Sequence, residues 1–265
     1  MAPTLAARIT RCALLGLAWL VLAFLMLPVL AVIPLSFNSE PFLSYPLAGF
    51  SLRWYRAVLS SSEWMAALKS SLIVGTATVL IATPLGTLAA FGLVRKSMPK
   101  AQVLMGLLLL PMALPVVVVA LALYMFLTRI GLANSYFGLI IAHSVLAAPF
   151  VLISVTAALA RFDFTQLRAG ASLGATPLRV FFTVTLPQIA PGVATGAIFA
   201  FITSWDEVVV ALFVAGPGQR TLPRQMFAGL REQLDPSIMV VATIMVVISV
   251  FLVVLGLLLR RRVAR

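Results

Sequence analysis

Charge and cysteine are scarce in this sequence. Only 10% of its 265 residues are charged, with 19 Lys and Arg against 7 Asp and Glu, while 62% are hydrophobic. Soluble domains carry about 25% charged residues, so the composition excludes an ordinary soluble domain and indicates an integral membrane protein. Cys12 is the single cysteine, which excludes an internal disulfide and a cysteine metal cluster.

The sequence motifs of catalysis are missing too. No Gly-Lys-Ser or Gly-Lys-Thr occurs, so the chain has no phosphate-binding loop with which to hydrolyse ATP by itself. His143 is the only histidine, and one histidine cannot form a His-based metal site or a His-Glu-x-x-His motif. We therefore expect no metal, no cofactor bound by this chain and no enzymatic activity, which leaves transport as the favoured function.

The formal net charge of +12 does not favour nucleic-acid binding, because the basic residues flank hydrophobic runs and form no patch interleaved with aromatic residues. Cytoplasmic loops of membrane proteins carry the excess of Lys and Arg. With the N-terminus inside, most of this excess falls in cytoplasmic segments, including Arg8, Arg95, Lys96, Arg161 and Arg260. The pattern predicts a multi-pass protein with both termini in the cytoplasm.

Long apolar runs are abundant. A helix needs roughly 20 mostly apolar residues to cross the hydrocarbon core, and six runs meet this length, at 13–35, 70–94, 101–127, 135–160, 191–215 and 237–259. The run before Ser39 is too long for a secretory signal, so it is expected to remain as the first helix. The prediction is an all-α protein whose 265 residues form a single transmembrane domain.

The connection between the fourth and fifth spans, 161–190, carries many specific residues. Phe162 to Leu173 has helical spacing, and Gly174 follows as a C-terminal cap that reaches positive φ easily. Thr176 is then a candidate N-cap and Pro177 fits the first turn of a second short helix, expected to run to Pro187. By the same reasoning Pro191 is expected to start the fifth span. The pattern predicts a helical hairpin on the cytoplasmic face.

This hairpin resembles the Glu-Ala-Ala loop of ABC importer permeases. The corresponding residues are Arg168, Ala169, Gly170, Leu173, Gly174, Ala175, Leu186 and Pro187. The resemblance continues through SFN at Ser36, WY at Trp54, KSSL at Lys69, LPMALP at Leu110, SWDEVV at Ser204 and DP at Asp235. It is closest to the C-type subunit of the spermidine/putrescine permeases.

The resemblance implies a type I importer permease in the bacterial inner membrane. Its expected partners are a second, B-type permease subunit in a heterodimer, two ATPase subunits that use ATP and Mg, a periplasmic substrate-binding protein and membrane lipid. The expected cargo is a polyamine or similar organic cation. Related permeases also move amino-acid-like compounds, opines, sulfate, molybdate or ferric iron, and these cargoes stay open.

The loop departs from the family pattern at two positions. Arg168 stands where the family has glutamate, and Gly170 replaces the second alanine. The positive charge of Arg168 could pair with an acid on the partner ATPase, or the arginine could only cover apolar surface with its aliphatic stem. A working coupling loop is favoured over a purely structural hairpin.

Trp205, Asp206 and Glu207 are the candidates for the substrate path. A charged side chain inside the bilayer costs roughly 2.5 to 3.5 kcal/mol on insertion scales, so such residues usually face a cavity or a partner. Two acids attract a cation, and Trp205 offers an aromatic face. The alternative is that the acids hold helices together through Arg129 or Arg220.

Tyr124 and His143 are weaker candidates, since each could simply form hydrogen bonds between helices. Pro111, Pro115 and Pro149 are able to kink their spans. The polar and aromatic segment 36–68 fits either a periplasmic partner or an aromatic belt at the membrane surface. A secondary transporter and a non-transporting scaffold subunit remain as other classes of function.

Overall fold

The structure is a computed structural model that describes residues 5–94, 98–232 and 235–263. Within these residues the chain is almost entirely helical, and β-structure is limited to an isolated bridge between Asn38 and Phe50. The elements are α1 (Leu5–Leu35), α2 (Arg53–Ser60), α3 (Ser62–Leu93), α4 (Ala101–Ala113), α5 (Val116–Arg129), α6 (Tyr136–Leu159), α7 (Thr165–Ser172), α8 (Pro177–Val180), the π-helix η1 (Phe181–Thr185), α9 (Leu186–Asp206), α10 (Val209–Val214), the 3-10 helix η2 (Pro217–Gln219), α11 (Leu222–Glu232) and α12 (Ser237–Val263).

The chain forms two compact units. Unit 1 contains residues 1–61 and 229–244, and unit 2 contains residues 62–228 and 245–265. In unit 1 the segment after α1 folds back on itself, which brings Tyr55 next to the end of α1. The Ser36 and Tyr55 hydroxyls share a hydrogen bond of 2.8 Å, and the Phe37 and Tyr55 ring centroids lie 5.0 Å apart. These contacts give the aromatic residues of the segment a defined local arrangement.

Among the described residues, five helices are long and apolar enough to cross a membrane: Thr10–Leu35, Ser62–Leu93, Tyr136–Leu159, Pro177–Asp206 and Ser237–Leu258. A sixth span results if the bent pair Ala101–Ala113 and Val116–Arg129 counts as one. Only with the bent pair counted as one span does the number equal that of the six apolar runs of the sequence. Four of the basic side chains that support the predicted orientation lie outside the described part of the chain: Arg8, Arg95, Lys96 and Arg260.

The third apolar run is not one straight helix. α4 and α5 meet at a bend of 103°, with Leu114 in an extended conformation at φ −87° and ψ 149°. Pro115 explains the break, since the proline ring disfavours helical backbone in the preceding residue. Pro111 and Pro149, by contrast, lie inside α4 and α6.

The fifth span also begins earlier than expected. The helix that starts at Pro177 does not end at Pro187, and Pro191 lies inside α9 rather than at its start. The π-helix η1 explains the continuation: the Leu186 N–H donates to the Phe181 carbonyl, one residue further back than in an α-helix. This wider turn lets the helix continue through a proline that lacks a donor.

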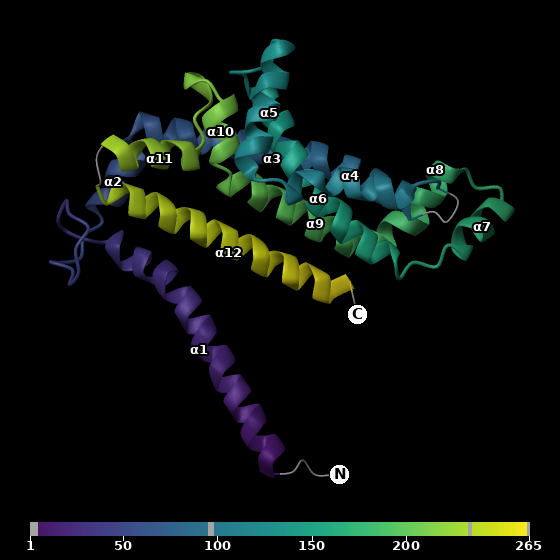
Figure 1. The fold of residues 1–265 in the computed structure, drawn as a ribbon, viewed down its shortest axis with the longest axis horizontal. Coiled ribbons are helices and arrows are strands. Elements are labelled where there is room, and N and C mark those ends of the chain that lie inside the picture. The colour runs from purple at the N-terminus through teal and green to yellow at the C-terminus, as the bar shows by residue number, and fades with distance from the viewer. Residues whose placement is uncertain (1–4, 95–97, 233–234, 264–265) are drawn as a thin grey trace. The chain divides into compact units, whose positions relative to one another are not determined.

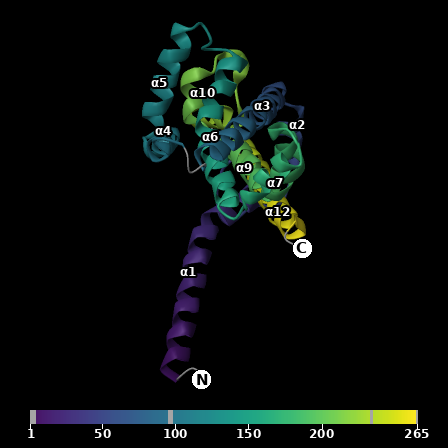
Figure 2. The same cartoon turned by 90° about the vertical axis from the view of Figure 1, so that its right-hand side faces the viewer.

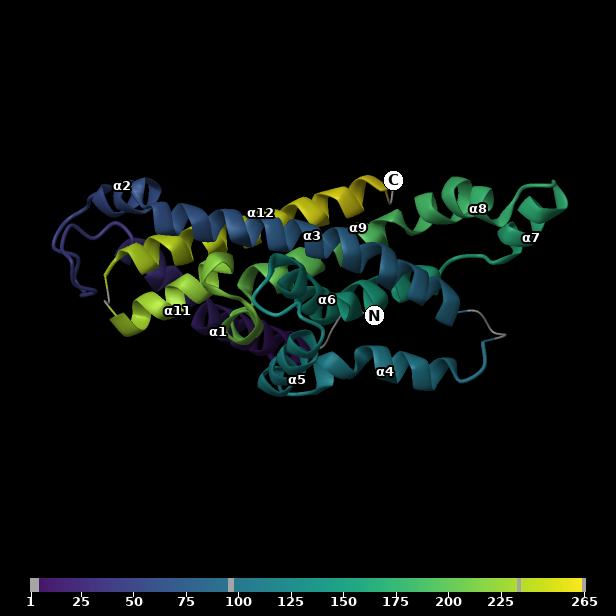
Figure 3. The ribbon, with the colours of Figure 1, turned by 90° about the horizontal axis from the view of Figure 1, so that it is seen from above.

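Three long helices of unit 2, α3, α6 and α9, pack side by side and form its centre (Figures 1 and 3). Val151 of α6 lies between two glycines. A Cβ at Gly86 of α3 would come within 2.7 Å of the Val151 side chain, and a Cβ at Gly196 of α9 within 2.9 Å of its backbone. Small residues at these positions allow the close helix approach that stabilises bundles in membranes.

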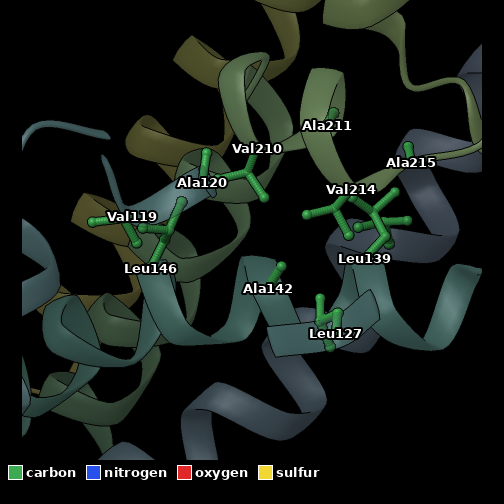
Figure 4. Close-up of a cluster of buried hydrophobic side chains, with 11 residues drawn as sticks. Val119, Ala120, Leu127, Leu139, Ala142, Leu146, Val210, Ala211, Val214 and Ala215 are labelled. Atoms are coloured by element: carbon green, nitrogen blue, oxygen red, sulfur yellow. The ribbon is translucent and has the colours of Figure 1, made fainter. Parts of the chain in front are cut away.

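A second core joins α10 to α5 and α6. Figure 4 shows Val210 and Val214 of α10 facing Ala120, Leu139 and Ala142 across the cluster. α10 therefore lies beside α5, as Figure 2 also shows. This packing fixes the chain directly after the end of α9, where the substrate-path candidates lie.

Candidate functional site

The predicted hairpin is α7, the turn at Gly174 and α8, and it forms one end of unit 2 (Figure 1). Gly174 has φ +77°, the left-handed conformation expected of a helix cap. The Gly174 N–H donates to the Ala171 carbonyl over 3.0 Å, and the Ala175 N–H donates to the Gly170 carbonyl over 3.1 Å. This pair of bonds is a Schellman motif, so the sequence correctly predicted how the first helix ends.

The second half of the hairpin is built as predicted at its start. The Thr176 hydroxyl accepts a hydrogen bond of 3.4 Å from the Arg179 N–H, and Pro177 occupies the first turn of α8. Gly170 has a steric role, because a Cβ there would lie 2.7 Å from a methyl group of Val180. The glycine that replaces the family's alanine thus lets α7 approach α8 closely.

α7 begins at Thr165, three residues later than the pattern predicted. Asp163 accounts for the start: its carboxylate accepts hydrogen bonds from the Thr165 N–H at 2.9 Å and from the Thr165 hydroxyl at 2.6 Å. The bonds from Thr165, chiefly that of its side chain, hold the pKa of Asp163 below its ordinary value. Asp163 is therefore an ionised cap at neutral pH.

The outer surface of the hairpin is apolar and basic. Leu173 is 88% exposed and Leu178 is 69% exposed, while Arg168 and Arg179 are exposed beside them. Arg168 forms no ion pair with any residue that the structure describes. Leu178 was not among the predicted site residues, although an apolar residue directly after Pro177 at the tip of a short helix is a signal that could have identified it.

The remaining hairpin candidates lie at its base. Leu186 is half-buried against the core of α3, α6 and α9, and Pro187 is exposed. The Gln188 amide donates a 2.6 Å hydrogen bond to the Gln166 side chain, which ties α9 to α7. The structure thus groups Arg168, Ala169, Gly170, Leu173, Gly174 and Ala175 at the tip and places Leu186 and Pro187 where the hairpin joins the bundle.

The substrate-path candidates lie where α9 ends. Trp205 is fully buried and its ring stacks on Phe201 at 5.6 Å, so its aromatic face is occupied within the fold. Asp206 is exposed, whereas Glu207 accepts a 2.9 Å hydrogen bond from the Val210 N–H and caps α10. Within the described part of the chain neither acid pairs with Arg129 or Arg220.

His143 and Tyr124 are placed differently. His143 is buried in α6, and its Nδ1 lies 2.8 Å from the Ser204 hydroxyl, next to Trp205. Tyr124 instead packs on the core shared by α5, α6 and α10. The sequence analysis missed Ser204, which links α6 to the end of α9; a hydroxyl adjacent to the Trp-Asp-Glu run was the available signal.

A polar network that the sequence did not reveal holds the segment 216–225. The Tyr136 hydroxyl donates to the Gly218 carbonyl over 3.2 Å and shares a 2.7 Å hydrogen bond with Ser70. The Leu222 N–H donates to the Ser71 hydroxyl over 2.8 Å. These bonds fasten the start of α11 to α3. Among the described residues no group of three His, Cys, Asp or Glu side chains could hold a metal ion.

Comparison with known proteins gives consistent matches over most of the chain. Residues 82–265 match the family described as binding-protein-dependent transport system inner membrane component. The spermidine/putrescine transport system permease protein PotC of Escherichia coli (strain K12) is 30% identical over 246 residues, which cover 93% of each chain. The putrescine transport system permease protein PotI of the same strain is 33% identical over 228 residues, or 83% of this chain and 81% of PotI.

Solved structures agree on the fold. A crystal structure of a bacterial ABC transporter involved in the import of the acidic polysaccharide alginate aligns with a TM-score of 0.72 at 15% identity, covering 99% of this chain and 99% of that chain. The fold is therefore that of the ABC importer permeases. The family match and the apolar helices indicate a multi-pass inner membrane protein. On the match of residues 82–265 and the identity to PotC, the chain belongs to the family of binding-protein-dependent transport system inner membrane components.

Proposed function

We propose that this chain is the permease subunit of an ATP-driven importer for polyamines or a similar organic cation. The named cargo of PotC and PotI, spermidine and putrescine or putrescine alone, supports this substrate class. The chain itself holds no catalytic residue and no cofactor. ATP and Mg are used by its ATPase partners.

The assembly pairs this chain with a second permease subunit of the B type in a heterodimer. Two ATPase subunits meet the cytoplasmic face, and a periplasmic binding protein delivers the substrate to the outer face. Both termini then lie in the cytoplasm. The excess of Lys and Arg in the segments on that side supports this orientation.

The observation that carries the proposal is the exposed tip of the hairpin. Leucines that are 88% and 69% exposed at positions 173 and 178 have no packing role in this chain alone. Burial in a groove of another protein removes such surface from water, at roughly 25 cal/mol per Å². The flanking Arg168 and Arg179 favour a groove with a carboxylate at its rim.

The substrate path is assigned to the end of α9. Asp206 supplies an exposed carboxylate for a passing ammonium group, and Glu207 shapes the path by capping α10. Trp205, His143 and Tyr124 support this region from within the bundle, as the His143 bond to Ser204 indicates.

The test is uptake of labelled spermidine by cells that express the complete transporter with Leu173→Asp. A charge in the apolar contact is expected to lower ATPase co-purification and ATP-dependent uptake by about tenfold or more. Leu52→Asp is the matched control, because Leu52 is 54% exposed and lies in the segment between α1 and α2. We expect it to leave ATPase co-purification unchanged.

Two results would contradict the proposed importer mechanism, and a third would contradict the proposed cargo. Uptake that continues when the ATPase is inactivated would indicate a secondary transporter. Stable assembly without uptake of any tested solute would indicate a scaffold subunit. Uptake of an oxyanion or an amino-acid-like compound in place of spermidine would support the ATP-driven permease and show that its cargo is not a polyamine.

A further inference from the structure

A pocket lies between α6 and α9 where these helices meet the hairpin. It has a volume of about 420 Å³, and its polar lining comes from Ser154, Arg161, Gln188 and Thr195. Small-molecule sites usually have volumes of roughly 300 to 1,000 Å³, so the pocket can hold a substantial chemical group. None of the residues assigned to the hairpin tip or to the substrate path lies in its wall.

The pocket sits at the level of the membrane surface. The apolar span of α6 ends at Leu159, two residues before Arg161. The α6 span Tyr136–Leu159 has 24 residues, a length of about 36 Å at 1.5 Å per residue, which is enough to cross a hydrocarbon core about 30 Å thick. Arg161, just beyond its end, therefore lies at the headgroup boundary on the hairpin side, and Gln188 lines the same pocket.

The charge of the pocket favours an anion. Arg161 is exposed and makes no ion pair with any residue that the structure describes. The nearest acid in sequence, Asp163, is absent from the pocket wall, and both of its carboxylate oxygens accept hydrogen bonds from Thr165. The positive charge of Arg161 is therefore available to a ligand.

The remaining walls suit a group that is polar at one end and apolar at the other. Phe162, Ile189 and Ala157 line the pocket beside the polar groups. Gly192 allows α9 to approach α6 here, because a Cβ at this position would lie 2.5 Å from the Ala158 Cβ. A cavity that combines one arginine, hydroxyl and amide groups and apolar walls at the membrane surface matches a phospholipid headgroup with the start of its chains.

We infer that this pocket binds the phosphate of an anionic phospholipid, with Arg161 as the charge partner. Basic pockets between membrane helices on the cytoplasmic side are suited to such headgroups. The assignment to the cytoplasmic leaflet rests on the orientation in the proposed function. Gln188, which lines the pocket, is also hydrogen-bonded to Gln166 of α7, so a bound lipid would lie against a residue that is bonded to the hairpin.

The test is native mass spectrometry of the purified full chain with phosphatidylglycerol and, separately, with zwitterionic phosphatidylcholine. We expect preferential binding of phosphatidylglycerol and a loss of about fivefold in its affinity in Arg161→Gln, the effect of one basic residue near a lipid surface. Ala157→Phe keeps the charge and fills the pocket, so it is expected to weaken binding as well. Arg179→Gln is the control, since Arg179 is an exposed hairpin arginine outside the pocket.

Several outcomes would overturn the inference. Equal losses in Arg161→Gln and Arg179→Gln would show that any surface charge suffices. Unchanged affinity in both Arg161→Gln and Ala157→Phe would place the lipid elsewhere. Release of bound phosphatidylglycerol by millimolar inorganic phosphate would identify the pocket as a site for free phosphate.

The lipid experiment is independent of the transport assay. It uses the isolated full chain, so it gives a result whether or not the chain binds an ATPase. If ATPase binding fails while phosphatidylglycerol binding depends on Arg161, the proposed function is wrong and the lipid site stands. If ATPase binding is observed while phosphatidylglycerol binding does not depend on Arg161, the proposed function stands and the lipid site is wrong.

Discussion

The adjacent acids Asp206 and Glu207 have different surroundings and therefore different expected roles. Glu207 uses its carboxylate to cap α10 through the Val210 N–H, whereas Asp206 is exposed. The sequence could not show this difference, because the break between α9 and α10 determines which of the two carboxylates can accept a hydrogen bond from a backbone N–H of α10. The alternative of pairing with Arg129 or Arg220 has no support among the described residues.

Asp206→Asn is expected to raise the KM for spermidine about fivefold while the amount of assembled transporter stays unchanged. The change removes an attraction between unit charges worth about 1 kcal/mol at 4 Å in water. Initial uptake rates over a range of spermidine concentrations measure it. Glu40→Gln is the control, because Glu40 is an exposed acid in the segment between α1 and α2.

Glu207→Gln keeps an oxygen that can accept from Val210 and is expected to retain normal assembly. A normal KM in Asp206→Asn would show that Asp206 does not contact the substrate and would favour a role in helix packing. An equal rise in Glu40→Gln would attribute the effect to the general charge of the outer surface.

At the scale of elements, the hairpin was the most predictable part of the chain because its signals are local. Gly174, Thr176 and Pro177 each act through backbone groups within a few residues, so the cap and the restart of the helix could be predicted. The continuation through Pro187 could not, because it depends on the shifted hydrogen bonds of η1. The proline before α5 predicted a kink but not its angle of 103°.

Gly174→Ala is expected to weaken ATPase binding and uptake. Alanine at φ +77° costs about 1 kcal/mol in the left-handed region, and this cost falls on the Schellman turn that presents Leu173. Gly131→Ala is a closely matched control, because Gly131 has φ +73° but follows α5. A Cβ added at either glycine would meet no atom within 4 Å, so the two variants differ in their place in the fold and not in local crowding.

Thermal unfolding and ATPase pull-down of both variants make the comparison. Similar losses of stability are expected in the two variants, with a loss of ATPase binding only in Gly174→Ala. If Gly131→Ala reduced ATPase binding equally, the effect would come from general destabilisation and not from the hairpin.

At the scale of the whole molecule, the sequence predicted the number of apolar runs but not which helices pack together. Helices such as α3 and α6 are apolar on all sides, so no amphipathic pattern marks the face that is buried. The contact of Val151 with Gly86 and Gly196 is a matter of steric fit between distant segments. The pairing of α3, α6 and α9 therefore required the structure.

The topology of the chain depends on whether the bent pair α4 and α5 crosses the membrane. If the pair crosses the membrane, six spans place both termini on the same side, as predicted. If the pair enters and returns on one side, five spans place the termini on opposite sides. The segments at Met98 and Ile130, which flank the pair, lie on opposite sides in the first case and on the same side in the second.

Cysteine accessibility distinguishes these topologies, because Cys12 is the only cysteine and Cys12→Ser provides a cysteine-free background. Single variants Met98→Cys, Ile130→Cys and Leu173→Cys use positions that are exposed in the structure. We expect a membrane-impermeant maleimide added to intact spheroplasts to label only the cysteine at position 130, and all three to be labelled after permeabilisation. Labelling of position 173 from outside would contradict the cytoplasmic hairpin, and the same accessibility at positions 98 and 130 would make α4 and α5 a re-entrant pair.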